Sequence, residues 1–259
     1  TLAGEGLQHQ DGHSHLLAYP VPTLLAYDPA FAYELAIIIE DGIRRMMTEQ
    51  EDVFYYLTVG NENYAMPPMP AGAGVREGIL RGLYRMRPTS LPDAPLRAQL
   101  FGSGSILNEA LKAQQRLEQQ YGVGADVWSV TSYKELRRDA LETERWNLLN
   151  PGQPPRVPYV ASALADAPGV LVAASDNVKT LPDSVARWLP KPLLSLGTEG
   201  FGRSEDRATL RDFFEVDERY ITLAALTALA REGQLPWERV QQAVRDLDIN
   251  PDKPNPLQA

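Results

Sequence analysis

Residues 96–130, LRAQLFGSGSILNEALKAQQRLEQQYGVGADVWSV, contain the pattern that decides the fold. The apolar run from Leu96 to Phe101 predicts a strand, and Gly102-Ser103-Gly104-Ser105 predicts a tight turn into a helix that ends near Tyr121. A second strand is predicted from Asp126 to Val130. A strand, a helix and a strand joined by short loops favour a right-handed crossover within a parallel sheet.

The same alternation continues toward the carboxyl terminus. We predict a helix over 132–149, a strand over 170–174, a helix over 181–188, a strand over 193–196 and three closing helices, the second of them over 217–231. The sequence therefore predicts the α/β class, with a mainly parallel sheet that is covered by helices on both faces.

The first seventy residues have a different organisation. Residues 1–19 predict an irregular loop, and Asp28-Pro29 predicts a helix start, because aspartate caps free amides and proline suits the first helical position. The β-branched and aromatic run over 53–59 predicts a buried strand. Prolines 67, 68 and 70 then predict a stiff, extended connector. We expect a domain boundary there, with one domain over 1–70 and a second over 71–259.

Composition excludes several classes of protein. The 259 residues carry a net charge of −9, which argues against nonspecific nucleic-acid binding. There is no cysteine, so thiol catalysis and thiolate metal sites are excluded. No apolar run reaches the ~18–20 residues of a membrane span, and no signal peptide is visible.

All three histidines lie near the amino-terminal end, at His9, His13 and His15, with Glu5 and Asp11 between or beside them. One interpretation is a solvated polar loop. A second is a metal site, because three imidazoles and a carboxylate are suitable zinc ligands, although Gly12 interrupts the usual helical spacing. A third is acid–base catalysis or anion binding, for which histidine is suited near neutral pH.

Two glycine-rich loops follow predicted strands, over 102–105 and 197–204. Either loop could bind an anion on its backbone amides, the second with help from Arg203. Neither carries a Walker lysine, and the first lacks a third glycine, so tight strand-to-helix turns are the simpler interpretation.

Several unusual motifs occur in a single order along the chain, and together they resemble the family of homodimeric bacterial pyruvate dehydrogenase E1 components. They are GEGLQHQDGHSH (4–15), YDPA (27–30), NENY (61–64), GSGSI (102–106), YGVG (121–124), SVTS (129–132), ERWN (144–147) and GFGRS (200–204).

The resemblance implies that residues 1–70 end a pyrimidine-binding middle domain and that residues 71–259 form a transketolase C-terminal-like domain. Family members are cytoplasmic homodimers that decarboxylate pyruvate with thiamin diphosphate and Mg²⁺, then reductively acetylate the lipoyl group of E2. The family's diphosphate and Mg²⁺ motifs have no match in this sequence, so we assign no metal ligands here. We expect the chain to need a missing N-terminal portion of E1, and to be inactive alone.

The resemblance also implies site residues. Glu5 and His9 match an acid and a histidine that line the family's active-site cavity, where a proton donor can stabilise negative charge that develops on the substrate. His13 is expected close to the substrate or cofactor, and His15 carries no assigned role. Three alternatives stay open: an E1-type enzyme for another 2-oxo acid, a structural or dimerisation module without turnover, and a histidine-rich metal site.

Overall fold

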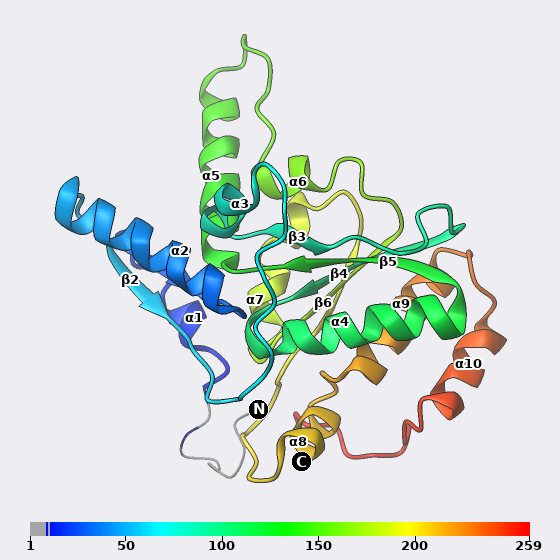
Figure 1. Ribbon diagram of the computed structural model, residues 1–259. Coiled ribbons are helices and arrows are strands. Elements are labelled where there is room, and N and C mark those ends of the chain that lie inside the picture. The colour runs from blue at the N-terminus through cyan, green and yellow to red at the C-terminus, as the bar shows by residue number, and fades with distance from the viewer. Residues whose placement is uncertain (1–8, 10) are drawn as a thin grey trace.

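The computed structural model describes residue 9 and residues 11–259. Its centre is a five-stranded sheet with the order β3-β5-β4-β6-β7 (Figure 1). The strands are β3 (Tyr84–Arg87), β4 (Leu96–Gly102), β5 (Val123–Ser129), β6 (Val170–Ala174) and β7 (Leu193–Leu196). All neighbouring pairs are parallel except β3, which runs antiparallel to β5 at one edge. The prediction of an α/β fold with a mainly parallel sheet is confirmed.

Alternation along the strands separates two hydrophobic cores. In β6, Val170, Val172 and Ala174 contribute to one core and Leu171 and Ala173 to the other, as the two-residue period of a strand requires. The first core is closed by α4 (Leu107–Arg116), which continues as a π-helical turn over Leu117–Tyr121, and by α9 (Glu218–Arg231). The second is closed by α5 (Tyr133–Leu149), α6 (Tyr159–Ala163) and α7 (Thr180–Asp183).

The remaining elements surround this sheet. Residues 11–57 contain α1 (Ser14–Leu17), β1 (Leu24–Tyr27), α2 (Ala32–Ile43) with a π-helical turn over Arg44–Thr48, and β2 (Phe54–Leu57). Then come α3 (Val75–Arg81), 3₁₀ turns at Gly104–Ile106 and Ala186–Trp188, α8 (Arg207–Phe213) and α10 (Trp237–Asp246). Within the residues that the structure describes, no helix has the length and apolar character needed to span a bilayer.

The amino-terminal segment packs directly onto the sheet. β1 and β2 form a separate two-stranded parallel sheet. Leu25, Tyr27 and Ile38 share a core with Ile79 and Tyr84 from beyond the connector. Residues 58–74 between β2 and α3 form neither helix nor strand, which agrees with the predicted extended connector. The domain boundary near residue 70 stays a prediction.

The predicted helix start at Asp28 is wrong. Helix α2 begins at Ala32 with Phe31 as its N-cap residue, and the side chain of Glu34 reaches back to accept the backbone N–H groups of Ala30 and Phe31. Asp28 is instead half-buried beside Thr58 and Gly104, and its carboxyl accepts from Thr58 rather than from the helix.

The strand at residues 53–59 exists, but it is shorter and less buried than predicted. β2 covers Phe54–Leu57; Phe54 is 49% exposed, and the other three residues are half-buried. The predicted helix over 181–188 is divided into α7 and a 3₁₀ turn, with Pro182 inside the first of these. Proline cannot donate a helical hydrogen bond, which favours such short turns.

Candidate functional site

The carboxyl ends of the neighbouring strands β4 and β6 lie side by side at one edge of the sheet, and we call this edge, with the loops that follow its strands, the crevice. The chain leaves β4 for β5 on one side, and β6 continues to β7 on the other, so this is the point where the strand order reverses. In open α/β sheets such a point is the usual place for a functional site. Here the loop over 102–105 follows β4, residues 175–178 follow β6, and Gly197-Thr198 follow β7.

The histidine-bearing segment lies against this edge. The backbone N–H of Val178 donates to the carbonyl of Gly12 at 2.7 Å. A side chain at Gly12 would lie only 3.1 Å from the hydroxyl of Thr198, so the two loops approach closely. Residues 11–15, distant in sequence, therefore become part of the crevice.

His15 begins a chain of hydrogen bonds inside the crevice. Its ring is 4% exposed, packs edge-on against Tyr56 and lies with Nε2 2.9 Å from Oγ1 of Thr58. Thr58 donates this hydroxyl to Oδ1 of Asp28 at 2.7 Å, and Nδ2 of Asn177 lies 3.5 Å from the second oxygen of Asp28. The chain connects α1 with the ends of β1 and β2 and with the loop after β6.

The carboxyl of Asp28 is held in a costly environment. Burial raises its pKa, and the neighbouring carboxylates Asp176 and Asp11 act in the same direction, whereas His15 opposes them when both of its ring nitrogens carry a proton. Gly104 follows β4 with a left-handed φ of 50° and brings its backbone N–H to the carbonyl of Asp28 at 3.1 Å. A Cβ at Gly104 would lie 2.8 Å from Oδ1 of Asp28, so only glycine allows this approach.

Asp11 fixes the turn that leads into α1. Its carboxylate accepts the backbone N–H groups of His13 and Ser14, at 3.3 and 3.0 Å, and the hydroxyl of Ser14 at 2.6 Å. Burial raises the pKa of Asp11, but the hydrogen bonds from Ser14 and His13 outweigh it, so the pKa lies below its usual value. This turn sets the direction in which the chain approaches His15.

The predicted site residues have different positions. Glu5 lies outside the described residues, and His9 and His13 are exposed. His15, which had no assigned role, is the histidine in the crevice. Asp28, Thr58, Asp176 and Asn177 were missed by sequence reasoning. One feature of the sequence could have identified them as site residues. Each lies within three residues after the end of a strand, and functional groups of parallel sheets usually lie at the carboxyl ends of the strands.

The described residues do not fit a magnesium–diphosphate site. No group of three His, Asp or Glu side chains within residue 9 and residues 11–259 could hold a metal ion. The crevice also gathers Asp11, Asp28 and Asp176, whose negative charges repel a diphosphate. We therefore derive no chemical step through thiamin diphosphate from these residues.

The second glycine-rich loop has a structural role. Arg203 donates to the carbonyls of Phe201 and Gly202 and to that of Ala259, and its guanidinium lies 5.3 Å from the ring centre of Phe213. Gly200 has a φ of 83° and touches the backbone of Pro256. The loop over 197–204 thus holds the carboxyl-terminal tail, and Arg203 is engaged there.

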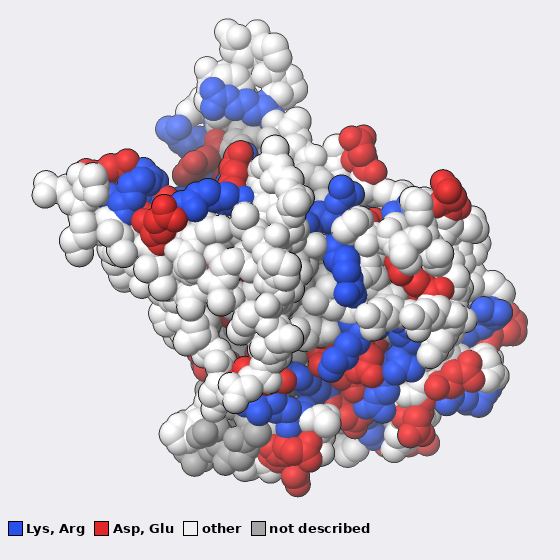
Figure 2. Space-filling view, in the orientation of Figure 1, with Lys and Arg blue, Asp and Glu red and all other residues white. Residues whose placement is uncertain are grey.

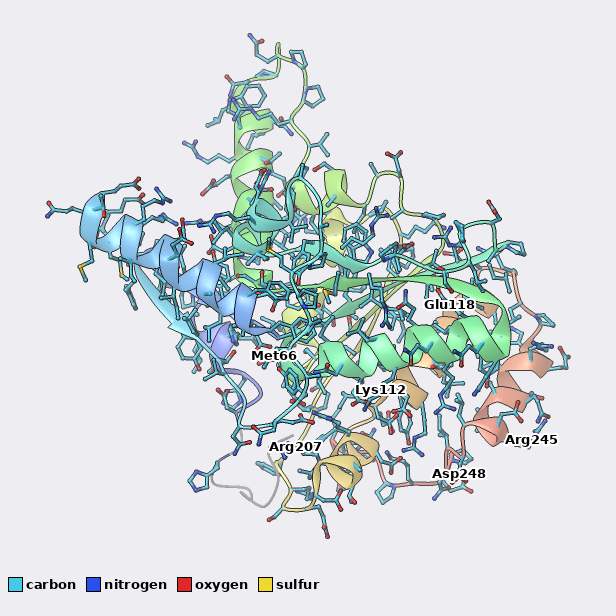
Figure 3. All side chains as sticks on the ribbon, viewed as in Figure 1. Met66, Lys112, Glu118, Arg207, Arg245 and Asp248 are labelled. Atoms are coloured by element: carbon cyan, nitrogen blue, oxygen red, sulfur yellow. The ribbon has the colours of Figure 1, made fainter. Side chains whose placement is uncertain are left out.

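A salt-bridge network fastens the connector beside the crevice. Arg211 of α8 is 6% exposed and pairs with Glu62 of the connector and with Glu109 of α4, the latter at 3.2 Å. Arg207 donates to Asn61 at 2.6 Å. Figure 3 shows Arg207 below the stretch of connector that carries Met66, and Figure 2 shows basic side chains in a row beside that connector.

A second buried carboxylate, Glu34, joins α2 to the sheet. Besides the two backbone N–H groups, at 2.6 and 3.0 Å, it accepts the hydroxyls of Tyr84 and Ser129, both at 2.6 Å. Burial raises its pKa and these four hydrogen bonds lower it, with burial prevailing. We call Glu34 with these four donors the junction, because it ties the amino-terminal segment to β3 and β5.

Comparisons with known proteins agree with this arrangement. Residues 1–67 match the family model of the pyruvate dehydrogenase E1 component middle domain. Residues 82–217 match that of the transketolase-like TK C-terminal domain. Among solved structures, a transketolase from Leishmania mexicana superposes with a TM-score of 0.61 at 16% identity, over 88% of this chain and 28% of that chain. A split-gene transketolase superposes with a TM-score of 0.57 at 16% identity, over 88% of this chain and 64% of that chain.

The similar sequences carry one name. The pyruvate dehydrogenase E1 component of Pseudomonas aeruginosa is 50% identical over 99% of this chain and 29% of its own length. The pyruvate dehydrogenase E1 component of Escherichia coli K12 is 48% identical over 99% of this chain and 28% of its own length. The chain thus spans less than a third of the length of these relatives. Its resemblance to the pyruvate dehydrogenase E1 component is confirmed, and the chain belongs to the family of the transketolase-like TK C-terminal domain.

Proposed function

We propose that this chain supplies the carboxyl-terminal part of a pyruvate dehydrogenase E1, which decarboxylates pyruvate with thiamin diphosphate and Mg²⁺ and reductively acetylates the lipoyl group of E2. The observation that carries the proposal is the 43–50% identity to relatives of that name over nearly the whole chain. The segment that bears the histidines also lies at the strand-order reversal of the sheet. We propose a cytoplasmic location.

Within this function, His9 is the proposed proton donor or acceptor, with Glu5 holding it or the cofactor in place and His13 nearby. His9 is exposed among the described residues, so a covering partner could bring substrate to it. Imidazole exchanges protons near neutral pH. The carboxylates of the crevice favour the view that the diphosphate and metal are held by the part of E1 that this sequence does not contain.

Exposed apolar side chains support the proposed need for partners. Ile39, Ile43 and Met47 follow one another at four-residue spacing along α2 and its π-helical turn, and they are 44%, 56% and 71% exposed. Phe54 of β2 adds to the apolar surface of this segment. Apolar side chains aligned in this way favour an interface, and the proposed occupants are the missing portion of E1 or the second subunit of a homodimer.

Two experiments test this proposal. Calorimetric titration of this chain with thiamin diphosphate and Mg²⁺ should show no tight binding, and micromolar binding would place the cofactor site here. The complete protein should decarboxylate pyruvate in preference to 2-oxoglutarate. A preference for 2-oxoglutarate would favour the alternative 2-oxo acid enzyme, and no turnover with either would leave the structural module as the better description.

A further inference from the structure

The direction of the hydrogen bonds in the crevice has a chemical consequence. A threonine hydroxyl has one proton to donate. When Asp28 is ionised, Thr58 donates this proton to Oδ1 of Asp28 at 2.7 Å rather than to the carbonyl of Tyr27 at 3.4 Å. The contact at 2.9 Å then needs a proton on Nε2 of His15, which donates to Thr58. If Asp28 were protonated, it could donate to Thr58, and Thr58 would then be free to donate to Nε2 of His15. The proton on Asp28 therefore determines which nitrogen of a neutral His15 ring is protonated.

We propose that His15, Thr58 and Asp28 form a positioning relay, in which Asp28 sets the tautomer of His15 and so holds the turn at residues 11–15, beside His9, in its working geometry. This inference rests on the proposed function, because the turn leads out of the segment proposed to be catalytic. His15, Thr58 and Asp28 act through that turn.

The surroundings of Asp28 favour such a role over a purely structural one. A buried carboxylate that only stabilises the fold is expected to accept several strong hydrogen bonds, as Glu34 accepts four. Within residue 9 and residues 11–259, Asp28 has one close side-chain donor, Thr58, and the amide of Asn177 at 3.5 Å. Among the described charged groups, Asp176 and Asp11 raise the pKa of Asp28 by their like charges, and a doubly protonated His15 ring lowers it. Tyr64 and Tyr133, from the connector and α5, also sense its charge.

The substitution Asp28→Asn distinguishes a role of Asp28 in the relay from a purely structural role. An amide at this position can accept from Asn177 and donate to Thr58, so it imitates protonated Asp28 and fixes one direction of the relay. The pKa of Asp28 is raised by burial. Its contribution to stability is therefore present at low pH and is lost as the pH rises through that pKa.

The experiment compares Asp28→Asn, Thr58→Val and Thr58→Ser in the complete protein. In Asp28→Asn we expect a thermal midpoint a few °C higher at about pH 8 and no gain at low pH. The kcat with pyruvate should fall about 10- to 100-fold with KM within about twofold. Thr58→Val should lower kcat similarly, and Thr58→Ser, which keeps the hydroxyl, should restore it to within about twofold.

Thr222→Val is the control, because it makes the same substitution at a buried threonine whose hydroxyl donates to a helix carbonyl, that of Glu218, in α9. It should leave kcat unchanged. Full activity in Asp28→Asn, equal activity in Thr58→Val and Thr58→Ser, or a loss of stability in Asp28→Asn at every pH would each overturn the relay. If the unsubstituted protein lacked pyruvate activity, the proposed function would fail, while the pH dependence of stability would still test the state of Asp28.

Discussion

Asp28 in the crevice, which is half-buried, and Glu34 in the junction, which is fully buried, both connect the amino-terminal segment to the sheet. Among the residues that the structure describes, Glu34 accepts from four donors, two of them backbone N–H groups, whereas Asp28 has one close side-chain donor and two like charges acting on it. Burial raises the pKa of both. Both carboxyls therefore hold a proton more tightly than a free carboxyl does, but among the described residues Glu34 has four close donors and Asp28 has one close side-chain donor.

The difference teaches how to separate stability from function in this chain. A fully satisfied buried network rigidifies a structure, and breaking it exposes the cost of an unpaired group. A strained or poorly satisfied carboxyl in a crevice is a candidate for chemistry or its control. Substitutions near the crevice should therefore change rate, and substitutions in the junction should change stability.

The largest effect is expected for His9→Ala in the complete protein. Loss of a positioned acid or base lowers the rate by about 10²–10⁴-fold, while loss of an exposed side chain changes stability by within about 0.5 kcal/mol. Steady-state kinetics with pyruvate, together with cofactor titration, measure both. Glu5→Gln should also reduce activity. Near-normal turnover in His9→Ala would remove His9 from the mechanism.

The controls for His9 follow from the structure. Arg245→Ala should leave rate and stability unchanged, because this α10 side chain bonds Gln242 on its own helix, at the far side of the molecule (Figure 3). His15→Ala, expected from the resemblance to be milder than His9→Ala in rate, should also reduce stability, because His15 is buried and bonded to Thr58.

The second effect is on stability and concerns Glu34→Ala. Removing the carboxylate leaves the two hydroxyls and two N–H groups of the junction without their acceptor, which should lower the free energy of unfolding by about 3 kcal/mol. Glu34→Gln should lower it less, because the amide oxygen still accepts. Urea unfolding of each variant measures the change.

The pH dependence gives this test a second outcome. Because the pKa of Glu34 is raised, its contribution is present at low pH and declines as the pH rises through that pKa. Glu34→Gln should remove that part of the decline. An unchanged unfolding curve in Glu34→Ala would show that the junction contributes nothing, and the contrast with Asp28 would disappear.

Four of the five strands of the sheet were predictable, because their signal is local. The run over 170–174 matches β6 residue for residue, and α9 ends at Arg231, as the predicted range 217–231 has it, two residues before Gly233 with its φ of 72°. The strands β1 and β3 were missed. β3 contains Arg85 and Arg87 and pairs only through β5, a contact distant in sequence. β1 depends likewise on its pairing with β2.

The site was predictable in its location near the histidines but not in its members. Motif resemblance points to Glu5 and His9, yet the crevice is assembled from His15, Thr58 and Asp28, whose contacts span 30 to 43 residues of sequence. Local rules even assigned Asp28 to a helix cap, because Asp-Pro is a good start signal when no other group claims the carboxyl. In the structure the carboxyl of Asp28 instead accepts from Thr58, a contact between residues distant in sequence.

The smallest effect is expected for Gly104→Ala, a substitution in the crevice that should change both stability and rate. Gly104 has a φ of 50°, and an added Cβ would lie 2.8 and 2.9 Å from the two oxygens of Asp28. The left-handed backbone and this contact should together lower the free energy of unfolding by about 1–2 kcal/mol. Because Asp28 must move, the relay predicts a several-fold lower kcat as well. Gly152→Ala is the matched control, since nothing lies within 4 Å of its added Cβ. If Gly104→Ala lowered stability but kept full kcat, moving Asp28 would not affect turnover. The difference between Asp28, expected to affect rate, and Glu34, expected to affect stability, would then be unsupported.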